Sequence, residues 1–370
     1  MKNLNRLLAV ICPSMALAIL VPESVDGQRL DRPAQVEALK QEIWSDYSTV
    51  TNAQSQLPPD ARAKGDALAA LHRAERRPAI DKLWAFVSAN PHDATALQAL
   101  GLVFEWGDHG AASRALERLI SDHADDDRLA PVLQAGYGNS LAAGKRAQLV
   151  QLLHQSRAPA VKGATLYLLA LEALSDPKKG QELYVRNEAL RQLKLVRDRY
   201  GDSPTILLGA GDQARLGDAA SALIFKTERL QVGALLPRFS ATDLNGRPVS
   251  SSQFAGKITL IDFWATWCPP CVAALPEVRS AYKSFSRQKL NVVSISGDAD
   301  PMTVKVFADR NRIPWTQWRV GPSGRLSNDW SNGSYPLYIL VDRHGRILAE
   351  GQRFEDISDR LKQGHFDRRM

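Results

Sequence analysis

The residues of this chain best suited to carry out a reaction are two cysteines separated by two residues, Cys268 and Cys271. A pair at this spacing can close a small disulfide ring when the first cysteine stands at the start of a helix. Free backbone N–H groups and the positive end of the helix dipole favour a thiolate there. We therefore expect Cys268 to attack as the nucleophile and Cys271 to resolve the mixed disulfide. The alternative is an ordinary structural disulfide.

The small numbers of cysteines and histidines argue against metal sites and against a disulfide scaffold. Three cysteines and seven histidines are little material for a zinc or iron–sulfur framework, so we expect no metal and no cofactor. The third cysteine, Cys12, lies in an apolar N-terminal run. In an oxidising compartment cysteines usually form structural disulfides. If the N-terminal run is removed, one close pair remains, which indicates redox chemistry rather than a disulfide scaffold.

Residues 1–22 have the pattern of an export signal. Lys2 and Arg6 precede an apolar run over residues 7–21, which is shorter than the ~20 residues of a spanning helix. We expect the chain to be exported to the periplasm or another extracytoplasmic compartment. An uncleaved N-terminal membrane anchor is the alternative.

The composition is that of an ordinary globular protein. Hydrophobic residues make up 44% and charged residues 24%, which excludes a mainly disordered chain. The 47 Lys and Arg exceed the 40 Asp and Glu, giving a net charge of +7. These basic residues are scattered and form no basic arm, so we expect no nucleic-acid partner. At 370 residues the chain is long enough for two domains.

The cysteines follow a segment that has the pattern of a buried strand. Residues 257–263 (KITLIDF) are mostly apolar, and a helix is expected from Pro270 onward. Asn245 and Gly246 predict a hairpin turn before this strand. Strands alternate with helices, which indicates an α/β sheet covered on both faces. Further strands are expected at residues 291–296, 338–341 and 347–349, and helices at 270–286, 301–311 and 355–363.

The residues around the pair, FWATWCPPC at 263–271, resemble the active-site motif of the thioredoxin superfamily. Over residues 232–353 the chain is most similar to the TlpA/ResA-like exported thiol–disulfide oxidoreductases. The resemblance implies an α/β thioredoxin-like domain over residues 232–370 that acts on protein thiols and disulfides. Peroxiredoxins share this fold, but their nucleophile signature needs a proline and a threonine where this chain has Ile261 and Ala265, which argues against peroxidase activity.

The resemblance also implies a proton acceptor at Asp262, six residues before Cys268. Thioredoxins carry an acid at this position that takes a proton from the resolving thiol, whereas many TlpA/ResA-like proteins have an asparagine there. Burial should raise the pKa of such a carboxyl toward a useful range. The alternative is a carboxylate that only makes hydrogen bonds at the end of the strand.

A substrate-binding rim is implied around the cysteines. Tyr335 and Pro336 stand where the superfamily has its cis-proline loop, and the backbone of Tyr335 could pair with an extended substrate segment. The alternative is a trans-proline in an ordinary loop. Trp267, with Trp264, is expected to shape the rim, although Trp264 could equally be a core residue. The expected substrate-binding residues are Trp267, Pro269, Pro270, Tyr335 and Pro336.

Residues 30–230 have the pattern of a helical array, with apolar residues recurring at spacings of three and four. Two segments, 99–120 and 210–230, look alike because each has a Gly-Asp turn between helices, and the first faintly resembles a tetratricopeptide repeat. We expect a stacked array that docks a protein partner, and the alternative is a spacer with no binding role. Helices are expected at residues 81–90, 94–106, 111–123, 164–174, 182–200 and 205–216.

The expected function is that of an exported thiol–disulfide oxidoreductase that exchanges disulfides with protein cysteines. Neither Pro269 nor Pro270 can donate a backbone N–H to a thiolate, and strongly oxidising relatives place a histidine between the cysteines. We therefore expect a reductant, supplied with electrons by a thiol reductase in the membrane. The alternative is a binding or assembly protein whose helical array recruits a partner and whose thioredoxin-like domain senses redox state.

Overall fold

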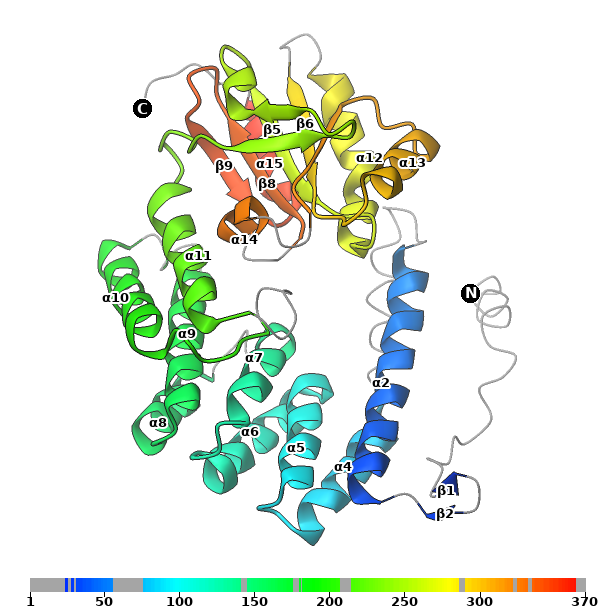
Figure 1. Ribbon diagram of the computed structural model, residues 1–370, viewed down its shortest axis with the longest axis vertical. Coiled ribbons are helices and arrows are strands. Elements are labelled where there is room, and N and C mark those ends of the chain that lie inside the picture. The colour runs from blue at the N-terminus through cyan, green and yellow to red at the C-terminus, as the bar shows by residue number, and fades with distance from the viewer. Residues whose placement is uncertain are drawn as a thin grey trace.

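The computed structural model describes residues 24–25, 28–29, 31–55, 76–140, 145–175, 180, 182–206, 214–285, 290–321, 325–331 and 335–363. The predicted export signal or anchor at residues 1–22, with Cys12, lies outside the described residues. Among the described helices, none has both the length and the apolar composition that crossing a bilayer requires. An all-α array comes first in the chain and an α/β domain second, which confirms the predicted architecture (Figure 1).

The array follows a short two-stranded ribbon and packs its helices around one apolar core. Its described elements are β1 (Ser24–Val25), β2 (Gln28–Arg29), α2 (Arg32–Ser55), α4 (Arg77–Ala89), α5 (Ala94–Trp106), α6 (His109–His123), α7 (Leu129–Ser140), α8 (Arg146–Gln155), α9 (Pro159–Ser175), α10 (Leu183–Tyr200) and α11 (Leu216–Arg229). Aspartates cap the N-termini of two of these helices. The Asp93 side chain accepts a hydrogen bond from the N–H of Ala96 in α5, and Asp108 does the same for Ala111 in α6.

The helix predicted at residues 205–216 is wrong in the described part of that segment. The N–H of Thr205 donates to the carbonyl of Ala214 at 3.1 Å, and Pro204 forms an antiparallel bridge with Arg215. The chain is therefore extended at both ends of this segment, and α11 begins only at its last residue.

The predicted correspondence between residues 99–120 and 210–230 is also wrong. The first Gly-Asp pair, at residues 107–108, separates α5 from α6, whereas the second pair, at residues 217–218, lies in the first turn of α11. The glycine of the second pair is needed for packing, because a Cβ there would lie 2.9 Å from the Cα of Gly201. The same Gly-Asp dipeptide therefore lies in a break between two helices in the first segment and at a close backbone contact within a helix in the second.

The α/β domain is built on a seven-stranded mixed sheet. In spatial order its strands are β4 (Pro248–Ser250), β3 (Ser240–Asp243), β7 (Thr316–Arg319), β6 (Asn291–Ser296), β5 (Thr259–Trp264), β8 (Leu337–Val341) and β9 (Ile347–Gly351). β5, β6 and β7 are parallel, and the other neighbours are antiparallel. The hairpin predicted at Asn245 and Gly246 joins β3 to β4. Because β5 and β6 are parallel, the loops that follow them meet at one edge of the sheet.

Helices cover both faces of this sheet. They are α12 (Pro269–Ser284), α13 (Pro301–Arg310), α14 (Arg325–Ser331) and α15 (Phe354–Gln363). Leu260 of β5 packs in the same core as Leu275 of α12, whereas Ile261 packs in the opposite core with Trp330 of α14. Alternate residues of a strand point to opposite faces, so Asp262 faces the side that α12 covers.

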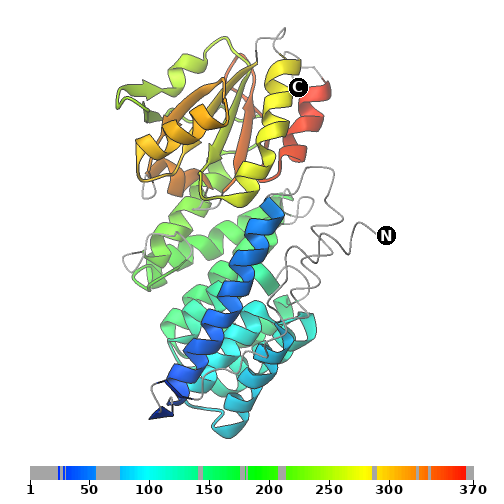
Figure 2. The same cartoon turned by 90° about the vertical axis from the view of Figure 1, so that its right-hand side faces the viewer.

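Among the described residues, contacts at both ends of the array join it to the α/β domain. The Phe225 ring of α11 lies 6.3 Å from the Trp330 ring of α14, and Lys226 Nζ lies 2.7 Å from Glu350 Oε1 of β9. At the other end of the array, α2 contacts α12. Figures 1 and 2 both show the C-terminal end of α2 beside the N-terminal end of α12. The array therefore reaches the end of the domain at which α12 begins.

Candidate active site

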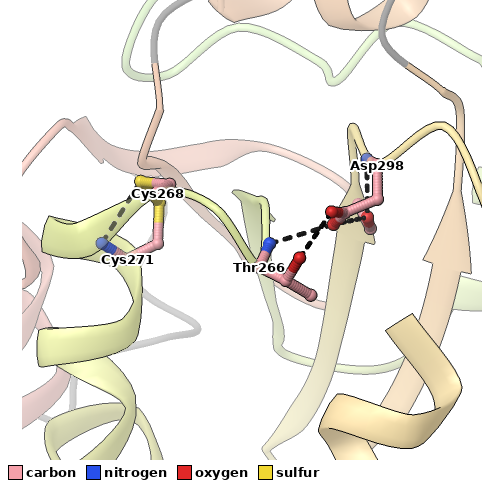
Figure 3. Close-up of a disulfide and its surroundings, with 5 residues drawn as sticks. Thr266, Cys268, Cys271 and Asp298 are labelled. Carbon is pink, nitrogen blue, oxygen red and sulfur yellow. Dashed lines mark hydrogen bonds between the residues drawn. A yellow bond between two sulfur atoms is a disulfide. The ribbon is translucent and has the colours of Figure 1, made fainter. Parts of the chain in front are cut away.

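The cysteine pair lies at the N-terminus of α12 (Figure 3). Cys268 and Cys271 form a disulfide with their sulfurs 2.03 Å apart, and both side chains are buried. Cys268 is the N-cap residue, and its sulfur accepts a hydrogen bond from the N–H of Cys271 at 3.3 Å. Because Pro269 and Pro270 lack an N–H, this is the first backbone donor that the helix offers. The helix therefore directs that donor to the sulfur predicted to be the nucleophile.

β5 and the residues after it position the pair. All six residues of β5 are buried. Its last residue, Trp264, is only 1% exposed, and its ring lies 5.4 Å from that of Phe307 in α13. Trp264 is therefore a core residue and not part of the rim. Trp267, next to Cys268, is 61% exposed and presents an aromatic surface to solvent beside the buried sulfurs.

A buried carboxylate that the sequence reading missed, Asp298, holds the loop before the cysteines (Figure 3). Its Oδ2 accepts hydrogen bonds from the N–H of Thr266 at 2.9 Å and from the hydroxyl of Ser296 at 2.7 Å. Its Oδ1 accepts a hydrogen bond from the Thr266 hydroxyl at 2.6 Å. The carboxylate thus ties the loop after β5 to the loop after β6. The sequence does hold a signal for this residue. Asp298 comes two residues after the end of β6, and because β6 runs parallel to β5, both strands end at the same edge of the sheet.

Asp262 is buried on the sheet face that α12 covers. Its Oδ2 accepts a hydrogen bond from the Ser294 hydroxyl at 2.7 Å, and its Oδ1 has no partner among the described residues. Burial raises the pKa of Asp262 to about 7, and the hydrogen bond from Ser294 opposes that rise. Tyr338, opposite Asp262 on β8, has a raised pKa mainly because it is buried and secondly because of the Asp262 charge. A carboxyl in this environment can take up or release a proton near neutral pH.

The residues before β8 reach the same edge of the sheet. The Tyr335–Pro336 peptide bond is cis, which is the geometry that the resemblance implied. Tyr335 packs against the cluster that contains both cysteines, and its ring lies edge-on to that of Trp267, with 5.7 Å between centroids. Gly297 leaves room for it, because a Cβ there would lie 2.2 Å from the Tyr335 hydroxyl. The predicted rim residues are therefore gathered around the disulfide.

An open pocket of about 420 Å³ lies beside the loop at Thr266 and was not predicted from the sequence. The facing wall comes from α13, where Met302 and Val306 are exposed and Phe307 is half-buried. Residues 302 and 306 are four apart, so they share one face of the helix. Asp300, Thr303 and Arg310 also line the pocket, so the wall beside the active-site loop is part apolar and part polar.

Comparisons with known proteins concern the second domain. A family model described as Redoxin matches residues 231–362. A curated protein named thiol-disulfide oxidoreductase ResA, from Bacillus thuringiensis subsp. konkukian, is 25% identical over 141 residues, covering 37% of this chain and 81% of that protein. A protein of the same name from Geobacillus kaustophilus is 27% identical over 143 residues, covering 37% and 82%.

One similar solved structure is the thioredoxin domain of a thiol-disulfide oxidoreductase from Bacteroides vulgatus. It is 25% identical with a TM-score of 0.34, and the match covers 36% of this chain and 97% of that one. A second is the C-terminal domain of a thiol-disulfide oxidoreductase from Bacteroides thetaiotaomicron, 27% identical with a TM-score of 0.33, covering 36% and 95%.

Proposed function

We propose that this chain, whose second domain is a TlpA/ResA-like member of the thioredoxin superfamily with thiol–disulfide oxidoreductase activity, reduces disulfides of exported proteins through Cys268 and Cys271. The observation that carries the proposal is the position of this pair. The two sulfurs are joined at a helix N-terminus, and the first N–H of the helix donates to Cys268 Sγ. The same donor would stabilise a thiolate at that atom in the reduced protein.

The reaction follows from these two sulfurs. In the reduced protein the Cys268 thiolate attacks one sulfur of a client disulfide, forming a mixed disulfide and releasing the other client sulfur as a thiolate. The Cys271 thiolate then attacks Cys268 Sγ, which releases the first client sulfur and closes the Cys268–Cys271 bond. Two electrons pass to the client, and two protons complete its thiols.

Asp262 is the proposed acceptor of the Cys271 thiol proton. Three features support this role: burial on the face that α12 covers, a pKa of about 7, and an Oδ1 without a partner among the described residues. An acid with this pKa is divided between its protonated and deprotonated forms near neutral pH, as proton transfer in both directions requires.

The client is proposed to lie across Trp267 and the cis-proline loop. The exposed Trp267 ring and the Tyr335 ring that meets it edge-on flank the disulfide. The backbone of Tyr335 would pair with an extended client segment, with Pro269, Pro270 and Pro336 completing the rim. A polypeptide bound in this way brings its own cysteine over Cys268.

The reduction potential of the pair tests the direction of the reaction. Equilibration with glutathione buffers should give a value near that of thioredoxin, about −270 mV, whereas a value near −120 mV would identify a disulfide-introducing oxidant and contradict the proposal. Cys268→Ser should abolish reduction of oxidised glutathione. Cys271→Ser should instead accumulate the mixed disulfide on Cys268, visible by mass spectrometry. The reverse pattern would exchange the two roles.

A reductant of this kind needs a steady supply of electrons. We propose that a thiol reductase in the membrane reduces the Cys268–Cys271 disulfide, and that the chain works in the periplasm or a comparable compartment after export by residues 1–22. A strain lacking the donor should accumulate the disulfide form. Thiol alkylation of cell extracts and comparison of the two forms by mobility would measure this.

A docking role for the helical array is the second candidate. Leu183 and Tyr184 at the start of α10 are adjacent and are 71% and 79% exposed. They stand beside an open pocket of about 500 Å³, which Tyr184 helps to line. The test is partner capture by a protein in which both cysteines are replaced by serine. Capture that persists in this protein and is lost when Tyr184→Ser is added would favour the binding function. Capture that instead requires Cys268 would count against it.

A further inference from the structure

Three buried polar groups form a row beside the proposed proton acceptor. The Nε1–H of Trp315, in the residue before β7, donates to Ser294 Oγ at 2.8 Å. The Ser294 hydroxyl in turn donates to Asp262 Oδ2 at 2.7 Å. Ser294 and Asp262 are register partners on the parallel strands β6 and β5. The row therefore runs across neighbouring strands, from the residue before β7 over β6 to β5. All three side chains are buried.

When Asp262 is in its carboxylate form, the chemistry of the three groups fixes the direction of both hydrogen bonds. An indole N–H can only donate, so the Ser294 oxygen must accept from Trp315. The serine oxygen could accept a second hydrogen bond, but an ionised carboxylate has no hydrogen to donate, so the Ser294 hydroxyl gives its single hydrogen to Oδ2. Oδ1 has no partner among the described residues. The two oxygens of one carboxyl group are therefore chemically unequal.

We propose that Ser294 and Trp315 are positioning residues that hold Oδ2 of Asp262 as a permanent acceptor and leave Oδ1 to carry the exchanged proton. The inference rests on the proposed acid–base role of Asp262. In the step concerned, the S–H bond of Cys271 breaks and an O–H bond forms at Oδ1, while the Ser294 hydroxyl keeps its own hydrogen. The proton returns to Cys271 when the disulfide is reduced again.

The other groups around Asp262 do not replace this donor. Tyr338 faces it from β8. The charges of Glu277 on α12 and Glu355 on α15 raise the pKa of Tyr338, and a carboxylate has no hydrogen to donate to Asp262. Cys271 belongs to α12 and is uncharged in the disulfide form. Ser294 is thus the donor that stabilises the carboxylate form of Asp262.

Removal of this donor should move the titration of Asp262 to higher pH. Ser294→Ala deletes the hydrogen bond and should raise the midpoint by about one pH unit, a tenfold change in proton affinity. Trp315→Phe keeps an aromatic ring but deletes the N–H that polarises the Ser294 hydroxyl, so it should raise the midpoint by less. Trp318→Phe is the matched control, since Trp318 is a buried tryptophan on β7 that packs in the opposite core.

The experiment is a pH titration of the full chain in its disulfide form, in which the cysteines carry no exchangeable proton. Carboxyl ¹³C signals of labelled aspartates are recorded, and the Asp262 signal is identified by its loss in Asp262→Asn. In parallel, the rate at which the reduced protein reacts with oxidised glutathione is measured across the same pH range. Circular dichroism checks that each variant is folded, and if Ser294→Ala is not, Trp315→Phe decides alone.

The two readouts separate this inference from the proposed function. An upward shift of the Asp262 signal and of the pH–rate profile in the variants, but not in the Trp318→Phe control, supports both. A shift of the signal with an unchanged rate profile supports the positioning of Asp262 and overturns its catalytic role. A signal that stays in place or moves to lower pH overturns the inference.

Discussion

Two buried carboxylates of the α/β domain are equally hidden from solvent but differently bonded. Asp298 is 3% exposed, and both of its oxygens accept hydrogen bonds from Thr266 or Ser296. Asp262 is 2% exposed, has one donor, and keeps one oxygen without a partner among the described residues. Burial alone therefore does not decide what a carboxylate does. The number of donors separates Asp298, which anchors a loop, from Asp262, for which we propose an exchange of protons.

The largest expected effect comes from Asp262→Asn, which should make the protein more stable and less active. At pH 8 the folded protein carries a buried carboxylate that burial disfavours, so the variant should gain about 4 kcal/mol in the free energy of unfolding. The rate of disulfide reduction should fall about 10²-fold with the loss of the proton acceptor. Urea unfolding and single-turnover kinetics measure the two quantities. A variant less stable than the parent would place Asp262 in the same class as Asp298.

The same difference should appear in the pH dependence of stability. The pKa of Asp262 is about 7 in the folded protein against an ordinary value of 3.8, so the unfolded chain releases this proton first as the pH rises. Its contribution should therefore lower the free energy of unfolding between about pH 4 and pH 7, by about 3–4 kcal/mol, and stay constant above that range. Subtraction of the Asp262→Asn curve isolates this term. A flat difference across the range would show that the folded carboxyl titrates normally.

Asp298→Asn should have a smaller effect of opposite sign on stability. At the position of Oδ1 the new amide NH₂ would face the Thr266 hydroxyl, and at the position of Oδ2 it would face the Thr266 N–H and the Ser296 hydroxyl, so at least one buried donor would lose its acceptor. We expect a loss of about 2–3 kcal/mol in the free energy of unfolding. Asp300→Asn is the matched control, because Asp300 caps α13 from an exposed position and asparagine caps as well as aspartate. Equal losses in the two variants would refute the anchoring role of Asp298.

The smallest expected effect comes from Thr266→Val, which deletes one hydroxyl and keeps the backbone N–H that bonds Asp298. We expect a loss of about 1 kcal/mol, with a matching increase in hydrogen exchange of the Thr266–Trp267 loop. Mass spectrometry of exchanged peptides measures the second quantity. A loop that exchanges no faster would mean that the hydroxyl adds nothing to the anchor.

Much of the second domain was readable from local signals. The run at residues 257–263 and the motif after it place a buried strand before a helix, and the structure has β5 and α12 there. Asp262 was found because it stands at a fixed distance from the cysteines along the chain. Pro336 was predicted at the rim because it directly precedes the apolar run that forms β8. Each of these signals is carried by residues that are close in sequence.

The features that were missed arise from residues distant in sequence. Asp298 and Thr266 meet only because β5 and β6 are parallel neighbours, and Trp315 reaches Ser294 through the packing of the loop before β7. The helix predicted at residues 205–216 failed for a related reason. There, Pro204 and Arg215 pair across the segment, a tertiary contact that overrides a locally apolar pattern.

The contact between α2 and α12 also has a consequence for how the molecule is made. The whole helical array separates α2 from α12 along the chain, so α2 leaves the ribosome well before its partner and the contact must wait for α12. Closing so long a loop costs little more entropy than closing a shorter one, so the length of chain between the two helices is a small obstacle to the contact. α2 thus completes its packing only when the α/β domain is in place, so this contact reports that the array and the domain have both folded.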